Sequence, residues 1–231
     1  QAVDDPADLA QLLDALPRVA APLLDAAPRQ EGFRETAWWE QTRREIVQDV
    51  QDSLRALDQL RGEYVPSQYE QAFGLLGEPA LVVEDPENGD SLRVRGFIDR
   101  VDRAPDGKVR IIDYKTGGPW GFTARAFKEG KKLQIALYAR AAEALGLGQV
   151  ADGYYWHVRH SAWHLEKAGK ADWFCLARAG PQDAIADALA YSWEAVRAVR
   201  AGQFAPKAPE DGCPDYCPAA GFCWHFDPRG W

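Results

Sequence analysis

Three residues in the middle of the chain have the types and spacing of a metal-dependent hydrolytic site. Asp99 follows an apolar stretch, and Asp113 and Lys115 lie near the end of the next one. Two neighbouring carboxylates repel each other unless a cation lies between them, and Mg²⁺ or Mn²⁺ prefers such oxygen ligands. Lys115 lies two residues after Asp113, so both side chains point to one face of a strand. There the ammonium can orient or deprotonate a water, or stabilise charge on a phosphate.

A hairpin is needed to bring these residues together. Residues 91–101 alternate between apolar and polar, residues 109–114 form a second apolar stretch, and Pro105-Asp106-Gly107 between them is a turn signal. Two strands joined by a short loop pair antiparallel. This pairing can place Asp99 and Asp113 at the same end of a sheet. An isolated Asp-x-Lys is common, so the combination, and not the tripeptide, indicates a site.

The spacing of apolar residues predicts the elements around this hairpin. We expect helices at residues 9–16 (interrupted by Pro17), 35–60, 124–145 and 184–199, and further strands at residues 153–158 and 173–177. Strands and helices alternating around one sheet indicate an α/β fold. The expected divisions are a helical N-terminal region packed on the core (1–62), the core itself (63–205) and a Cys-rich tail (206–231).

The composition is that of an ordinary globular protein, with 46% hydrophobic and 27% charged residues. No apolar run approaches the ~20 residues that span a bilayer, and no signal peptide is visible, so we expect a cytoplasmic protein without a membrane partner. The net charge of −8 argues against coating nucleic acid by bulk charge, but permits a local basic groove. The chain contains no methionine, which suggests a domain cut from something larger.

The two strands together resemble a known family. Gly-Phe-Ile-Asp-Arg-Val-Asp at residues 96–102 and Ile-Ile-Asp-Tyr-Lys-Thr-Gly at residues 111–117 are similar to the nuclease domain of the RecB-like PD-(D/E)xK family. That family includes the nuclease modules of RecBCD and AddAB helicase–nucleases and the CRISPR-associated RecB-like exonucleases. Gln134 and Tyr138 match its Gln-xxx-Tyr element and share a helix face. Residues 66–73 resemble one of its strands.

The resemblance, which covers about residues 64–226, implies a restriction-endonuclease-like core with a mixed central sheet flanked by helices. Asp99 and Asp113 would bind Mg²⁺ or Mn²⁺, with the carbonyl of Tyr114 as an additional ligand. Lys115 would be the catalytic lysine.

Further residues would contact DNA or support the site. Gln134 and Tyr138 have this role by resemblance. Glu70 is a weaker candidate, for which a strand-surface charge is the equal alternative. The basic stretch before Gln134 could be a phosphate-contacting rim or a solvated helix start; it consists of Arg125, Lys128, Lys131 and Lys132.

The implied activity is metal-dependent hydrolysis of DNA, as an exonuclease on single-stranded ends in repair and recombination, with a helicase subunit as a possible partner. One feature of the family is missing: a metal-binding histidine on a preceding helix. No histidine occurs before His157. Either that helix precedes Gln1 or the site has lost a ligand. The alternative function is therefore a catalytically weak or inactive DNA-binding scaffold module of a helicase–nuclease complex.

Cys213, Cys217 and Cys223 resemble the three-cysteine element of the iron–sulfur branch of this family. A 4Fe–4S cluster is implied in the intact protein, with a fourth cysteine ahead of the nuclease core. No cysteine precedes Cys175. Alternatively, the three thiolates and His225 could hold Zn²⁺; for Cys175 we expect a buried structural thiol instead.

Two other groups of residues are expected to have mainly structural roles. His157, His160 and His164 have poor spacing for zinc, and an exposed hairpin edge is expected for them. The nine tryptophans are expected mostly in the core. A few could stack on single-stranded bases, but the sequence does not indicate which.

Overall fold

The computed structural model describes residues 7–167, 173–204, 212–213, 217–224 and 226. The chain divides into two compact units, residues 1–189 and 190–231. The fold described below is that of the first unit. The divisions expected at 62/63 and 205/206 stay predictions.

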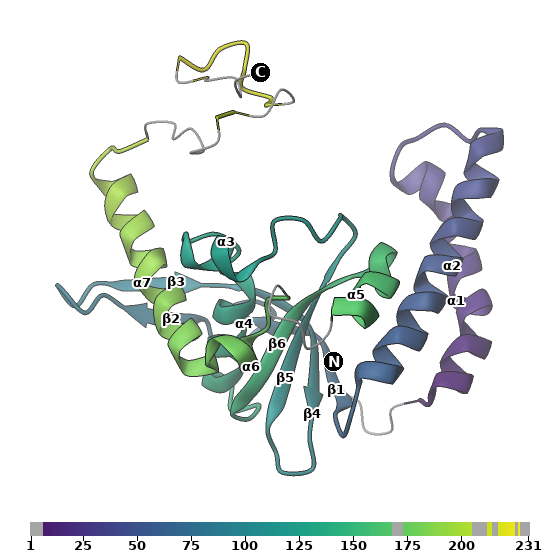
Figure 1. The fold of residues 1–231 in the computed structure, drawn as a ribbon, viewed down its shortest axis with the longest axis horizontal. Coiled ribbons are helices and arrows are strands. Elements are labelled where there is room, and N and C mark those ends of the chain that lie inside the picture. Colours follow the sequence, from purple (N-terminus) through teal and green to yellow (C-terminus); the bar gives the residue numbers. More distant parts are fainter. Residues whose placement is uncertain (1–6, 168–172, 205–211, 214–216, 225, 227–231) are drawn as a thin grey trace. The chain divides into compact units, whose positions relative to one another are not determined.

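The core is a four-stranded mixed sheet in the order β1-β4-β5-β6. Its strands are β1 (Val65–Phe73), β4 (Gly96–Arg103), β5 (Val109–Lys115) and β6 (Val150–His157). The first three are antiparallel to their neighbours, whereas β6 runs parallel to β5. Helices flank this sheet (Figure 1), so the predicted α/β fold with a mixed central sheet is confirmed.

The β4–β5 hairpin forms as the sequence predicts. Arg103 pairs with Val109 at the turn and Arg100 with Ile112 further along. Within the turn the N–H of Gly107 donates to Ala104 O at 2.9 Å, and Gly107 adopts φ 84°, a conformation that favours glycine.

The sheet has two faces, and a different helix covers each. We call the face that carries Asp99, Asp113 and Lys115 the front face, and the opposite one the back face. On the back face, helix α2 (Ala37–Leu60) buries Leu57 in a cluster that contains Ile112 and Trp156. On the front face lies α4 (Gln134–Ala144), whose Ile135 N–H donates to the Tyr155 hydroxyl.

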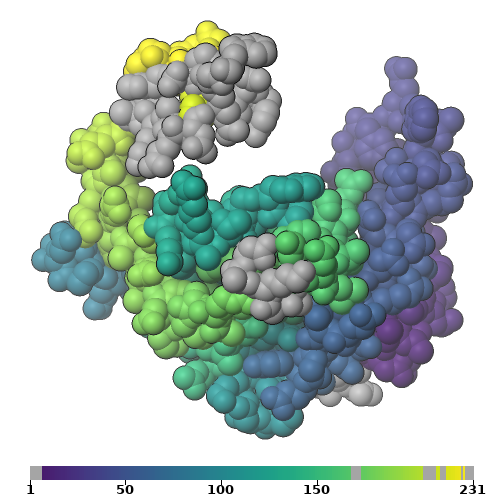
Figure 2. Space-filling model, viewed as in Figure 1, coloured from purple at the N-terminus to yellow at the C-terminus, as the bar shows by residue number. Residues whose placement is uncertain are grey.

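Two further helices pack on α2. Helix α1 (Leu9–Gln30) lies beside α2, and α5 (Ser161–Lys167) also packs on α2, as the adjoining green and blue surfaces in Figure 2 show. Strands β2 and β3 form a separate two-stranded sheet. The other bounds are β2 (Leu81–Glu84), β3 (Ser91–Val94), α3 (Ala124–Lys128), the 3-10 turn η1 (Val158–His160), α6 (Leu176–Ala179) and α7 (Pro181–Arg200).

The interruption predicted at Pro17 is wrong, because α1 continues through Pro17, Pro22 and Pro28. Pro17 and Pro22 both lie on the exposed side of the helix. On that side, carbonyl groups that lose their helical donor can bond to water. The helix therefore tolerates both prolines.

The single strand expected over residues 91–101 is also wrong. Residues 91–94 pair with β2, and residues 96–103 join the main sheet. Gly96 stands at the junction, where an added Cβ would lie 3.0 Å from Cζ of Phe73. The alternation of side chains continues through the junction, although the pairing partner changes.

Two further predictions need correction. The helix expected over residues 124–145 is split into α3 and α4, because Gly130 and Lys132 have φ 73° and 56°. The strand expected over residues 173–177 is wrong, since a short helix begins at Leu176. Within the described residues, no helix has the length and apolarity to cross a membrane; the cytoplasmic location stays a prediction.

Candidate active site

Asp99 and Asp113 face each other where the hairpin strands separate. The last pair of the β4–β5 ladder is Arg100 with Ile112, so the next positions along the strands are Asp99 and Asp113. Here a side chain replaces the backbone bonding: the N–H of Tyr114 donates to Oδ2 of Asp99 at 2.8 Å. The front face therefore holds two carboxylates at the point where β4 and β5 diverge.

The Asp113 carboxylate is unusually poor in partners for a buried charge. The residue is 1% exposed, and its Oδ1 has no hydrogen-bond partner within the described part of the chain. Burial raises the pKa of Asp113 from 3.8 to about 6; Lys115 opposes this rise, and the charge of Asp99 adds to it. A buried carboxylate with an unsatisfied oxygen beside a second carboxylate suits a hard divalent cation.

Lys115 is held by three front-face groups. Its ammonium forms an ion pair with Asp113 and donates to Oε1 of Gln134 at 2.9 Å. The amide of Gln134 donates in turn to the Tyr138 hydroxyl at 2.6 Å. The ammonium also lies 5.5 Å from the centre of the Tyr155 ring. These contacts fix both ends of the Gln134 amide and orient Lys115.

The same geometry connects Tyr138 to the carboxylates. Burial raises the pKa of the Tyr138 hydroxyl; the hydrogen bond from Gln134 lowers it, and Asp113, Asp99 and Glu70 raise it. The hydroxyl therefore stays protonated near neutral pH. The structure thus brings together five predicted site residues: Asp99, Asp113, Lys115, Gln134 and Tyr138. Their individual roles stay predictions.

Glu70 lies at the edge of this group. The β1–β4 register pairs Tyr69 with Arg100 and Gln71 with Ile98, which places Glu70 opposite Asp99. Glu70 is exposed and has φ 47°, so the strand is distorted there. Among the described residues, no three His, Cys, Asp or Glu side chains lie together as a possible metal site. Glu70 is therefore not grouped with Asp99 and Asp113 as a third ligand in the described part of the chain.

The basic stretch before α4 has mixed surroundings. Arg125 and Lys131 both bind Glu129 at the surface, at 2.8 and 2.9 Å. The ammonium of Lys132 instead lies 4.1 Å from the centre of the Phe122 ring. Lys128 is the last residue of α3. Contact of these residues with DNA stays a prediction.

Sequence reasoning missed two residues of strand β6. Register pairs Tyr155 with Asp113 and His157 with Lys115. The Tyr155 hydroxyl donates to Lys132 O at 2.5 Å, and Nδ1 of His157 lies 2.9 Å from Gly117 O. Their alternation on the strand predicted at residues 153–158 was the available signal.

The exposed hairpin edge expected for the histidines is wrong. His157 is 1% exposed and His164 is fully buried. The N–H of His157 donates to Nε2 of His164 at 2.7 Å, and the His164 ring stacks on Trp156 at 4.2 Å. His160 lies in the turn between them. Burial of these polar rings depends on contacts between β6 and α5 that the spacing of the histidines does not reveal.

The back face carries a second charged group, in which the carboxylate is fully paired. Asp102 accepts hydrogen bonds from Nε of Arg100 at 2.5 Å and from Nη2 of Arg110 at 2.8 Å. Arg100 also donates to the Tyr114 hydroxyl at 3.1 Å. Tyr114 is thus held from the front by Asp99 and from the back by Arg100. The role of the Tyr114 carbonyl as a metal ligand stays a prediction.

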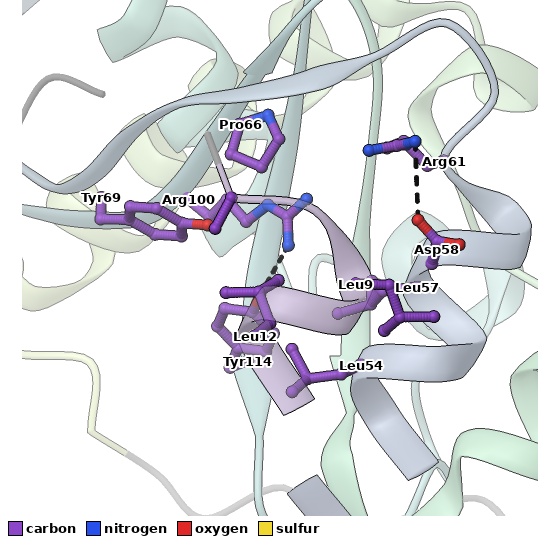
Figure 3. Close-up of a pocket in the computed structure, with 11 residues that line it drawn as sticks. Leu9, Leu12, Leu54, Leu57, Asp58, Arg61, Pro66, Tyr69, Arg100 and Tyr114 are labelled. Carbon is purple, nitrogen blue, oxygen red and sulfur yellow. Dashed lines mark hydrogen bonds and ion pairs between the residues drawn. The ribbon is translucent and has the colours of Figure 1, made fainter. Parts of the chain in front are cut away.

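A cavity of about 370 Å³ adjoins this group between the sheet, α1 and α2. Figure 3 shows Leu9, Leu54 and Leu57 lining it on one side and the Arg100–Tyr114 pair on the other. The cavity is largely apolar and lies on the back face. It therefore belongs to the packing of the helical region and not to the Asp99–Asp113 site.

The cysteines of the tail form no disulfide among the described residues. Cys213 is buried, and Cys217 and Cys223 are partly buried. The N–H of Cys223 donates to Ala219 O at 2.8 Å, within a short series of turns. His225 lies outside the described residues. Cys175, at the N-terminus of α6, is buried as predicted, and burial raises the pKa of its thiol.

The sequence is similar to known nucleases. The family model described as the PD-(D/E)XK nuclease superfamily matches residues 2–224. Two bacterial relatives are each named as a subunit of an ATP-dependent helicase/deoxyribonuclease. The one from Alkaliphilus metalliredigens is 35% identical over 85 residues, which is 35% of this chain and 7% of the relative. The one from Moorella thermoacetica is 31% identical over 138 residues, which is 58% of this chain and 11% of the relative.

The aligned part of this chain thus spans about a tenth or less of the length of these relatives. The family model, in contrast, covers nearly all of the chain, including the hairpin and the Gln134 helix. The chain belongs to the PD-(D/E)XK nuclease superfamily.

Proposed function

We propose that this chain is a metal-dependent nuclease domain that hydrolyses phosphodiester bonds in DNA. The observation that carries the proposal is Asp113: a buried carboxylate with one unsatisfied oxygen, opposite Asp99 and beside Lys115. Asp99 and Asp113 would hold Mg²⁺ or Mn²⁺, with the Tyr114 carbonyl as a further ligand. When bound, the cation would neutralise charge developing on the phosphate and lower the pKa of the attacking water.

The protein's own groups have separate tasks in this proposal. Asp99 holds the hairpin ends in position through the N–H of Tyr114. Lys115 presents its ammonium to the phosphate or to the attacking water, and Gln134 and Tyr138 fix the direction of that ammonium. A positioned cation in a partly dehydrated site stabilises developing negative charge more effectively than a solvated one.

The direct test is cleavage of labelled single-stranded DNA with Mn²⁺. Asp113→Asn and Lys115→Ala should each reduce the rate by about 100-fold or more while the protein stays folded. Matched controls exist at the other end of the same hairpin, where exposed Lys108 pairs with Asp106 at 2.6 Å. Asp106→Asn and Lys108→Ala should leave cleavage unchanged. Undiminished cleavage by the Asp113 and Lys115 variants would contradict the proposal.

The proposal also specifies the DNA substrate and the biological process in which the nuclease acts. The relatives' name joins a helicase with a deoxyribonuclease, and a helicase produces single strands. We therefore propose exonucleolytic action on single-stranded ends, in repair and recombination, beside a helicase partner. Comparing end-labelled linear with circular single strands tests the need for an end, since an exonuclease leaves the circle intact.

A DNA-binding scaffold module is the second candidate. The observation that favours it is the ligand set: the described residues bring no third His, Cys, Asp or Glu side chain together with Asp99 and Asp113. If the wild-type chain binds DNA with Mn²⁺ present but never cuts it, this second function replaces the first.

The Cys-rich tail carries a separate prediction. We propose that Cys213, Cys217 and Cys223 bind a 4Fe–4S cluster in the intact protein, or alternatively Zn²⁺, on the strength of the family resemblance. The described residues do not bring three such side chains together, so no part of the nuclease proposal depends on this metal. Iron, sulfide and zinc contents of protein purified without oxygen decide between the two.

A further inference from the structure

One large aromatic side chain near the front face is exposed to solvent. Trp120 lies in the loop between β5 and α3 and is 78% exposed. This loop runs past the ends of β5 and β6 (Figure 1). It leaves the sheet directly after Lys115. Five residues of chain span at most about 18 Å, so Trp120 is confined to the surroundings of the candidate site.

The base of this loop is firmly anchored. Nδ1 of His157 hydrogen-bonds to Gly117 O at 2.9 Å. The ring of Phe122 lies 4.7 Å from the His157 ring and 4.8 Å from the Tyr155 ring. The ammonium of Lys132 lies 4.1 Å from the centre of the same Phe122 ring. Residues on either side of Trp120 are therefore attached to β6, next to the strand that carries Lys115.

The indole itself has a defined position. Its ring meets the His160 ring edge to face, with centres 5.3 Å apart. It also covers Gly118 so closely that an added Cβ there would lie 2.0 Å from Cζ3 of Trp120. Only glycine permits this approach. Gly118 and His160 thus hold the indole in position, while most of the indole surface remains in contact with solvent.

An exposed indole on a loop that begins after Lys115 and packs against Lys132 through Phe122 suits one kind of occupant. A nucleobase offers a flat face for stacking, and its phosphates are attracted by ammonium groups such as those of Lys115 and Lys132. In a duplex both faces of an internal base are already stacked. In a single strand they are available. The arrangement therefore favours single-stranded over double-stranded DNA.

We propose that Trp120 is a stacking platform for a nucleobase of single-stranded DNA, close to the phosphate that Lys115 contacts. This inference rests on the proposed function for the position of the phosphate, and it adds the residue that selects single strands. Trp120 binds the substrate without taking part in the bond cleavage.

The test measures binding without cleavage, in the presence of a metal chelator. Two labelled strands of equal length are compared: oligothymidylate, and an abasic strand that keeps the phosphates but lacks the bases. The wild-type protein should bind oligothymidylate about tenfold to hundredfold more tightly. Trp120→Ala should lose most of this preference with little change in binding of the abasic strand. Trp120→Phe, which keeps a ring, should restore much of it.

A matched control is available in α2. Trp38 is also 78% exposed, so Trp38→Ala removes an equally exposed indole away from the loop and should keep the full preference. The inference is overturned if Trp120→Ala retains the preference for bases, or if the wild-type chain binds no single strand.

The cleavage assay separates the two proposals. Preference for bases that depends on Trp120, in a chain that never cuts, supports this inference and contradicts the nuclease activity. If the chain cleaves DNA but its preference for bases does not depend on Trp120, the nuclease activity is supported and this inference is contradicted.

Discussion

The front and back faces of the β4–β5 hairpin both carry buried charge, but they balance it differently. On the back face, two arginines surround the single carboxylate of Asp102, and the carboxylate is fully hydrogen-bonded. On the front face, one ammonium, that of Lys115, pairs with Asp113, and Oδ1 of Asp113 lacks a partner among the described residues. The carboxylate of the back face is satisfied within the protein, whereas Asp113 on the front face keeps an unsatisfied oxygen. A carboxylate with every oxygen bonded maintains the fold, whereas one with an unsatisfied oxygen is suited to bind a ligand.

The largest effect on stability is expected from a substitution on the back face. Asp102→Asn leaves the guanidinium groups of Arg100 and Arg110 buried without a counter-charge. Loss of one partner of a buried ion pair costs about 3–5 kcal/mol, so the free energy of unfolding should fall by about this amount. Urea denaturation measures it. Asp106→Asn, at the exposed turn, should not change the midpoint. A midpoint equally unaffected by Asp102→Asn would remove the distinction between the faces.

On the front face, removing the carboxylate charge should increase the free energy of unfolding instead of lowering it. The pKa of Asp113 is raised from 3.8 to about 6, so the folded protein favours the protonated form. Ionisation therefore costs stability as the pH rises from about 4 through 6, and the loss is complete above that range. It corresponds to about 3 kcal/mol. Asp113→Asn should recover up to this amount at pH 8 and nothing near pH 3.

This measurement is made by urea denaturation across pH with a chelator present, so that no cation compensates the charge. If Asp113→Asn is less stable than wild type at pH 8, the Lys115 ion pair outweighs burial. The Asp113 carboxylate would then be satisfied within the protein, as that of Asp102 is.

A smaller effect is expected from the hydrogen bonds behind Lys115. Gln134→Ala removes the acceptor of the Lys115 ammonium and the donor to Tyr138. Cleavage should fall by about tenfold, because the lysine is less well oriented, while the urea midpoint moves little. Tyr138→Phe should give part of the same loss. A rate unaffected by either change would show that Asp113 alone positions Lys115.

The smallest effect concerns the basic stretch before α4. If Lys131 contacts a phosphate, Lys131→Ala should reduce the slope of log affinity against log salt by about one. Lys108→Ala, at the far end of the hairpin, provides the control with an unchanged slope. An unchanged slope for Lys131→Ala would leave Lys131 as the surface partner of Glu129 only.

The hairpin could be predicted because its information is local. Alternation sets the faces, Pro105-Asp106-Gly107 sets the turn, and together they place Asp99 opposite Asp113. The Gln134–Tyr138 pair follows from helical spacing, and its connection to Lys115 agrees with the supporting role expected for it.

Other features depend on contacts between elements, which the local sequence pattern does not reveal. Nothing in the alternation of residues 91–101 shows that the strand changes sheets at Gly96. His157 and His164 look like surface residues until Gly117 O and the backbone of His157 supply their hydrogen bonds. The Arg100–Asp102–Arg110 group was missed as well, although opposite charges two residues apart on a strand between apolar residues were a visible sign.

The hydrogen bond from Tyr114 N–H to Asp99 has a consequence for linkage between ligands. With Oδ2 of Asp99 engaged and Oδ2 of Asp113 paired to Lys115, each carboxylate offers its other oxygen to a cation. Mg²⁺ takes six oxygen ligands and often draws some from substrate phosphates, so the positions that the protein does not fill would be taken by water and DNA. Cation and DNA should then bind with positive cooperativity, each increasing the affinity of the other by the same factor.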